Sequence, residues 1–174
     1  MIADACEGLD LQLVISLGGG QDPSLLGDLP GDPIVVGYAP QLELIRRSTL
    51  TISHGGLNTA LESLAWGVPL VVLPVAYDQP GVGARVEWAG VGRSIPVGRL
   101  TIGRLRDAVR EVLGNPAYRK LARSHRLEIE AADGLNRAAD VIEAVFATSR
   151  RALPAQERVT HTSNRGSNYD EASS

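Results

Sequence analysis

Cysteine and aromatic residues are scarce in this chain, and its net charge is not positive. The single cysteine, Cys6, excludes an internal disulfide and is typical of a reducing compartment, so we expect a cytoplasmic protein. The formal net charge is −3 and no basic block occurs, which argues against nucleic acid binding. No apolar run approaches the roughly 20 residues of a membrane-spanning helix, so we expect neither a transmembrane segment nor a secretory leader.

The apolar residues that are present suffice for one domain. Hydrophobic side chains make up 44% of the 174 residues and aromatic ones only 4%, so we expect an aliphatic core rich in valine and leucine. From about Ser149 the sequence turns polar, with Ser, Asn, Thr and Arg, a composition typical of disordered segments. We therefore predict a folded domain over residues 1–148 and a disordered tail over residues 149–174.

Apolar runs and helical patterns alternate along the domain. Strands are predicted over residues 11–17, 34–36, 50–53, 69–74 and 94–97, and helices over 41–47, from Gly56 and over 81–89. This alternation predicts an α/β fold with a Rossmann-like, doubly wound parallel sheet, whose last strand lies at an edge because it contains Pro96. Three further helices are predicted, two beginning at Thr101 and Asn115 and one including apolar positions over 138–146.

The most informative motif is His54-Gly55-Gly56, which follows the strand ending at Ser53. Glycines there let the backbone approach a ligand closely. The helix predicted from Gly56 begins with unpaired N–H groups, which form an anion site. A lone histidine is more often a packing or capping residue than a ligand, but His54 at this helix start favours phosphate binding, with Thr59 as a further donor.

More polar side chains follow in the order that a ribose and a sugar require. Glu62 comes one turn after Asn58 on the same predicted helix and can accept hydrogen bonds from two vicinal hydroxyls. Asp78 and Gln79 follow the strand over 69–74 at its carboxyl end, where open α/β sheets bind ligands. The alternatives are a solvent-facing Glu62 and an Asp78-Gln79 pair that caps the next helix.

The stretch from Tyr38 to Gln79 resembles the donor-binding signature of the UDP-glycosyltransferases with the two-domain GT-B fold. The matching elements occur in the family's order: Tyr38-Ala39-Pro40-Gln41, His54 to Thr59, Glu62, Gly67-Val68-Pro69 and Asp78-Gln79. The continuation over 78–85 and 90–93 is most similar to the bacterial zeaxanthin glucosyltransferase branch. The similarity extends from about Leu9 to Phe146 and leaves only the polar tail uncovered.

The resemblance implies a role for each matching residue. It assigns the uracil to Tyr38 and Ala39, the ribose to Gln41 and Glu62, the diphosphate to His54, Gly56, Asn58 and Thr59, and the hexose to Asp78 and Gln79. Many family members have tryptophan at the positions of Tyr38 and Leu57, and a plain aromatic cover on the sheet edge is the alternative for Tyr38. Neither a cofactor nor a metal ion is implied.

The resemblance also implies parts that lie outside this chain. The general base of the family belongs to an N-terminal, acceptor-binding domain, and none of the three histidines, His54, His125 and His161, is its counterpart. The first strand of the donor domain normally precedes the helix that opens this sequence, and it is also missing. We therefore expect an exposed sheet edge and self-association through it.

Two classes of function follow. The first is the donor half of an inverting glycosyltransferase that moves glucose from UDP-glucose to a hydroxyl of a hydrophobic acceptor and is inactive without its N-terminal partner domain. The second is a non-catalytic nucleotide-sugar-binding fragment, or one subunit of a split enzyme. A nucleotide-sugar epimerase is less favoured because the Pro-Gln and Asp-Gln elements favour transferases. A dinucleotide loop at Gly18-Gly19-Gly20 is disfavoured because the G-x-G-x-x-G spacing is absent.

Overall fold

A computed structural model describes residues 1–152 of the chain, with side chains to residue 148. These residues fall into two units, one over Met1–Asp133 and one from Gly134 onward. The strands are β1 (Val14–Ser16), β2 (Ile34–Val36), β3 (Thr51–Ser53), β4 (Leu70–Val72) and β5 (Gly92–Ser94). The helices are α1 (Ile2–Cys6), α2 (Gln41–Arg47), α3 (Leu57–Ala65), α4 (Gln79–Trp88), α5 (Ile102–Gly114), α6 (Pro116–Ala132) and α7 (Gly134–Ala152), with 3-10 turns at Pro23–Leu26 and Val97–Arg99.

The strands form two parallel sheets, which confirms the predicted α/β class with parallel strands. One sheet has the order β1-β2 and the other the order β3-β4-β5. In the first, Val14 pairs with Ile34; in the second, Thr51 pairs with Leu70 and Leu70 with Gly92. The strands divide into two sheets because β1 and β3 are not hydrogen-bonded neighbours.

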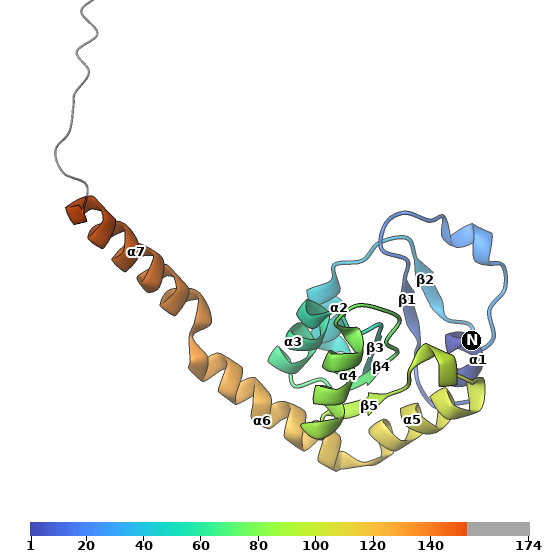
Figure 1. Cartoon of the computed structure of the whole chain (residues 1–174). Helices are drawn as coiled ribbons and strands as arrows, with labels where there is room; N and C mark the ends of the chain where they lie inside the picture. The colour runs from blue at the N-terminus through green and yellow to red at the C-terminus, as the bar shows by residue number, and fades with distance from the viewer. Residues whose placement is uncertain (153–174) are drawn as a thin grey trace, which may run out of the picture. The chain divides into compact units, whose positions relative to one another are not determined.

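Helices cover both faces of the three-stranded sheet. Alternate residues of β4 point to opposite faces, so Val71 joins a core cluster with Ala5 of α1 and Leu105 of α5. Leu70 and Val72 join a second cluster with residues of α3, α4 and α6. Figure 1 shows α1 close to α5 and α3 close to α4, and both pairs of helices are in contact.

The fifth strand begins earlier than its predicted start at Ser94. It runs over Gly92–Ser94, and the chain turns into a 3-10 helix from Val97. A Cβ atom on Gly92 would lie 2.0 Å from the Leu70 carbonyl oxygen. Glycine therefore permits close pairing with β4. As predicted, β5 lies at the edge of its sheet, but Pro96, on which the prediction rested, lies beyond the strand.

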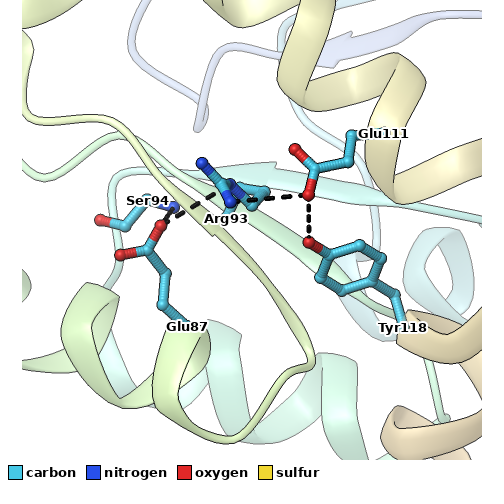
Figure 2. A network of polar contacts seen from close by, with 5 residues as sticks. All are labelled: Glu87, Arg93, Ser94, Glu111 and Tyr118. Carbon is cyan, nitrogen blue, oxygen red and sulfur yellow. Dashed lines mark hydrogen bonds and ion pairs between the residues drawn. The ribbon is translucent and has the colours of Figure 1, made fainter. Parts of the chain in front are cut away.

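A polar network joins β5 to the helices around it (Figure 2). The Arg93 guanidinium lies 3.7 Å from a Glu87 carboxylate oxygen and 3.5 Å from one of Glu111. The Ser94 N–H donates to Glu87 at 3.1 Å, and the Tyr118 hydroxyl donates to Glu111. Burial, together with the hydrogen bond to the Glu111 carboxylate, raises the pKa of Tyr118. The network thus fixes α4, α5 and α6 around one strand.

The later helices begin as the sequence predicts. The Thr101 hydroxyl accepts from the Arg104 N–H at 3.2 Å, and the Asn115 side chain accepts from the Ala117 N–H at 3.0 Å, so each caps its helix. In α7 the side chains of Val141 and Phe146 are 64% and 66% exposed. This helix ends at Ala152, just beyond the predicted domain boundary at 148, and the rest of the predicted tail lies outside the described residues.

Candidate functional site

The predicted site residues follow the carboxyl ends of three strands. Tyr38 to Gln41 follow β2, His54 to Glu62 follow β3, and Asp78 follows the loop after β4. Since β3 and β4 are parallel neighbours, their carboxyl ends meet at one edge of the sheet. The segment after β2 belongs to the other sheet, and hydrogen bonds join it to α3.

A sharp turn connects β3 to α3. Gly55 has a φ of +92°, and a Cβ atom there would lie 2.6 Å from a methyl carbon of Val72, so only glycine fits. The Gly55 N–H donates to the Ser53 hydroxyl at 3.1 Å. A Cβ atom on Gly56 would lie 3.0 Å from Nε2 of His54, which places the imidazole directly beside the start of the helix.

The first turn of α3 offers backbone donors. The helix begins at Leu57, as predicted, and Gly56 at its N-cap position supplies no side-chain hydrogen bond. The N–H groups of a first helical turn have no partner within the helix, and the positive end of the helix dipole lies there. Asn58 is exposed and Thr59 half-buried on this turn. Together with His54 these groups can surround an anion.

Three side chains from α2 and α3 meet beside this helix start. Nε2 of Gln41 donates to the Thr59 hydroxyl at 3.3 Å and also to the Glu62 carboxylate. Gln41 is the first residue of α2, and the other two lie one turn apart on α3. The structure thus brings together the two residues that the resemblance assigns to the ribose. A carboxylate held in this way keeps further lone pairs for ligand hydroxyls.

Asp78 and Gln79 differ in what they contact. Asp78 stands at the N-cap position of α4 and is exposed, but its side chain makes no capping hydrogen bond, so the capping alternative is not realised. Oε1 of Gln79 accepts from the N–H groups of Val75 and Ala76 at 2.9 and 3.0 Å. The Gln79 side chain therefore holds the loop in place with its oxygen and keeps its amide NH₂ group as a donor.

Two tyrosines border the site, and sequence reasoning singled out only one. Tyr38 is 73% exposed, and its ring lies 3.7 Å from where a Cβ atom on Gly19 would stand. Tyr77 is 94% exposed and has a φ of +56°, an unusual conformation for an aromatic residue. The sequence signal that could have pointed to Tyr77 is its position immediately before Asp78, in the short loop that follows β4.

The rest of the described chain supplies no comparable constellation. Within residues 1–152 no group of three or more His, Cys, Asp and Glu side chains is placed to hold a metal ion. His125 lies on α6, 2.9 Å from the Glu128 carboxylate, and His161 lies outside the described residues. A cavity of about 470 Å³ opens beside Trp66, at the opposite end of α3 from Gly56.

Comparison with known proteins decides the family. Residues 1–144 match the model of the C-terminal domain of proteins like erythromycin biosynthesis protein CIII. The chain belongs to this family. It matches the C-terminal domain of GT-B glycosyltransferases in fold as well: it superposes on the glycosyltransferase of kitacinnamycin with a TM-score of 0.75 and 36% identity, covering 82% of this chain and 37% of that one.

Several curated relatives are named as glycosyltransferases. The chain is 37% identical over 143 residues to the uncharacterized UDP-glucosyltransferase YojK of Bacillus subtilis (strain 168), covering 82% of this chain and 35% of that protein. It is 33% identical over 155 residues to a zeaxanthin glucosyltransferase of Pantoea ananas, covering 87% of this chain and 36% of that protein. The chain thus spans about a third of the length of these relatives. Within residues 1–152, no helix is long and apolar enough to cross a membrane.

Proposed function

We propose that this chain binds the nucleotide-sugar donor of a glycosyltransferase, with UDP-glucose as the donor and a hydroxyl of a hydrophobic acceptor as the receiving group. The cluster of Gln41, Thr59 and Glu62 beside the start of α3 carries the proposal. A carboxylate and an amide close to an uncapped helix N-terminus match the hydroxyls of a ribose next to a diphosphate. The names of the curated relatives, a UDP-glucosyltransferase and a zeaxanthin glucosyltransferase, support the choice of donor.

The remaining site residues have matching roles in this proposal. Tyr38 stacks on the uracil, and the Ala39 backbone pairs with its edge. The diphosphate is bound by His54 and the first turn of α3, and the hexose hydroxyls by Asp78 and the amide NH₂ group of Gln79. These two lie on the loop after β4, the strand next to β3, so the sugar extends from the helix start toward that loop.

The chemical contribution of this half is electrostatic. Departure of UDP leaves negative charge on the β-phosphate, and His54 with the N–H groups of Gly56 and the first turn of α3 stabilises that charge as it develops. The base that deprotonates the acceptor belongs to a facing N-terminal domain. His54 is the histidine of the proposed site, and its position beside the diphosphate suits charge stabilisation better than proton abstraction from an acceptor.

Titration calorimetry tests the donor assignment. We expect UDP-glucose and UDP to bind the purified chain more tightly than NAD or ATP. Both UDP ligands carry the uridine that Tyr38 and Ala39 are proposed to bind, whereas NAD and ATP carry adenosine. A circular dichroism melt of the same sample establishes that the protein is folded. Equal affinities for all four ligands, or no binding to folded protein, would contradict the assignment.

Turnover measured with and without an N-terminal domain separates the two functional classes. We expect no transfer of glucose to any hydrophobic alcohol, because donor and acceptor must be held together and the acceptor deprotonated within hydrogen-bond reach. A co-expressed N-terminal domain of a related enzyme supplies both requirements, and slow turnover in that mixture favours a split transferase. Binding without turnover in the mixture favours the non-catalytic fragment. Product formation by the chain alone would contradict its dependence on a partner.

A further inference from the structure

The cavity beside Trp66 lies where the end of α3 meets α6. It is lined by Trp66 and Gly67 at the end of α3 and by side chains of α6 that include Arg119, Arg123 and Leu127. A Cβ atom on Gly67 would lie 3.0 Å from Cγ of Arg123, so the two helices approach each other closely there. All these residues belong to the unit over Met1–Asp133, so the cavity is formed within one folded unit.

Arginine side chains gather around this cavity. Arg119, Arg123 and Arg126 follow one another at spacings of four and three residues, so they share one face of α6. Two guanidinium groups lie over the Trp66 ring, with Cζ of Arg46 of α2 and of Arg126 at 5.9 and 5.7 Å from its centroid. The face of an aromatic ring attracts cations. We call Arg46, Arg119, Arg123 and Arg126 the arginine cluster.

Half of the arginine cluster has no partner of opposite charge. The two arginines over the Trp66 ring lie 3.5 Å from a carboxylate oxygen of Glu43 and 2.8 Å from one of Glu130. Among the side chains that the structure describes, Arg119 and Arg123 contact neither a carboxylate nor a carbonyl oxygen. Two positive charges therefore remain at the cavity, although the whole chain has a formal net charge of −3.

An arginine at the end of a helix can also serve as a cap, and Arg106 shows that arrangement in this protein. Its guanidinium donates to the carbonyls of Ala5 at 3.0 Å and Glu7 at 3.3 Å, at the end of α1. Within the described part of the chain, no such hydrogen bond joins Arg119 or Arg123 to the end of α3. Capping of α3 thus does not account for their ten N–H donors.

Two free guanidinium groups one helical turn apart match a tetrahedral oxyanion. Residues at i and i+4 have Cβ atoms about 6 Å apart, so both side chains can reach one anion. A carboxylate offers two oxygens in one plane, which a single guanidinium already occupies bidentately. A phosphomonoester offers three terminal oxygens and a charge of about −1.5 to −2 at pH 7. That charge balances the two positive charges left in the arginine cluster.

The cavity has room for more than a phosphate group. Its volume of about 470 Å³ lies within the range of small-molecule sites, roughly 300–1,000 Å³. Besides arginines it offers the side chains of Trp66 and Leu127, which are 37% and 66% exposed. Covering these surfaces with an apolar or aromatic part of a ligand is favourable.

We propose that this cavity binds a soluble phosphomonoester, with the phosphate held by Arg119 and Arg123 and an aromatic or apolar part packed against Trp66 and Leu127. A concave site between two helices suits a soluble ligand better than a flat layer of lipid headgroups. The proposal does not depend on the donor site at Gly56, which lies at the other end of the nine-residue helix α3, about 13 Å away at 1.5 Å per residue.

NMR of the full chain, labelled with ¹⁵N, tests the site with phenyl phosphate. The chain has a second tryptophan, Trp88, which is 90% exposed and lies outside the cavity. We expect the probe to shift the indole N–H signal of Trp66 and the amide signal of Gly67 and to leave the Trp88 indole unchanged. The loss of one signal in Trp66→Phe assigns the indoles. A response confined to the amides of Gly55 and Gly56, or no shift at the cavity, would overturn the proposal.

A pair of charge-matched variants tests the phosphate contacts. Replacing Arg119 and Arg123 together by Gln, which keeps a good helix former at exposed positions, should weaken phenyl phosphate on the order of tenfold or more. The control replaces Arg110 and Lys120 by Gln, which removes the same charge from exposed helical positions outside the cavity. We expect it to weaken binding less than about twofold, because salt screens exposed charges. Equal losses in the two variants would overturn the proposal.

Three further ligands test the chemical class. Benzoate lacks the tetrahedral phosphate and inorganic phosphate lacks the aromatic part, so we expect both to bind on the order of tenfold more weakly than phenyl phosphate. An affinity of either equal to that of phenyl phosphate would overturn the assignment. Phosphatidylcholine vesicles that contain phosphatidic acid present the same phosphate on a lipid. Binding to these vesicles without binding of phenyl phosphate would show that the ligand is a membrane surface and would also overturn the proposal.

Discussion

The two sheets of this protein differ in how completely they are buried. Leu70, Val71 and Val72 of β4 are all 0% exposed, whereas Val14 of β1 and Ile34 of β2 are 39% and 51% exposed. All five residues are apolar and lie in parallel strands, so residue type does not explain the difference. Strand β4 has a neighbour on each side and helices on both faces, while β1 has one neighbour. Burial of a strand in this fold therefore depends on its neighbours more than on its own sequence.

The candidate donor site depends on both sheets. Gln41 follows β2, whereas Thr59 and Glu62 follow β3, and the hydrogen bonds between them connect the two sheets at the ligand edge. The phosphate and hexose parts of the proposed site follow β3 and β4 alone. Changes that shift the β1-β2 pair are thus expected to affect the base and ribose contacts first.

The largest expected effect breaks the close pairing in the three-stranded sheet. In Gly92→Ala the added Cβ atom meets the Leu70 carbonyl oxygen at 2.0 Å, and backbone atoms have little room to shift. We expect a loss of about 3 kcal/mol in the free energy of unfolding, the upper part of the range for overpacking, measured by urea denaturation. The matched control is Gly103→Ala in α5, where no atom lies within 4 Å. A Gly92→Ala variant as stable as this control would show that β4 and β5 do not pair as described.

A pair of valine truncations compares the two sheets directly. Val71→Ala removes buried methyl groups from the core cluster of β4, and we expect a loss of about 2 kcal/mol. Val14→Ala acts on a side chain that is 39% exposed, and we expect a loss within about 0.5 kcal/mol. Comparing the urea denaturation midpoints of the Val71→Ala and Val14→Ala variants gives the relative stability losses. Equal losses would mean that the β1-β2 pair is as well buried in solution as β4.

A smaller effect concerns the network around β5. Tyr118→Phe removes the hydrogen bond to Glu111, and we expect a loss of about 1 kcal/mol at pH 8. The pKa of Tyr118 is raised in the folded state, so the native protein holds this proton more tightly than the unfolded chain. The stability it contributes is present below the ordinary tyrosine pKa of about 10 and is lost as pH rises through the folded value. Urea melts at pH 8 and above pH 10 should therefore show the two proteins converging, and a constant gap would contradict this account.

Local patterns in the sequence predict most of the observed elements, and they also single out the residues of the proposed site. The strand before His54, the helix from Gly56 and the caps at Thr101 and Asn115 follow from turn and capping chemistry within a few residues. The division into two sheets depends on which strands become neighbours, a long-range property that periodicity does not contain. The close pairing of Gly92 with β4 is a contact between residues that are distant in the sequence. The hydrogen bonds that the Gln79 oxygen accepts depend on how its loop folds. Neither is visible as a pattern of residue types.

The proposed function places the diphosphate at the start of α3 and the hexose at Asp78. The most direct test is titration calorimetry of Asp78→Ala and His54→Ala with UDP-glucose and with UDP. Asp78→Ala should weaken UDP-glucose by about 1–3 kcal/mol, the range for hydrogen bonds to charged groups, and leave UDP nearly unchanged, whereas His54→Ala should weaken both ligands. If Asp78→Ala weakens UDP as much as UDP-glucose, the proposed separation of the phosphate and sugar contacts is wrong.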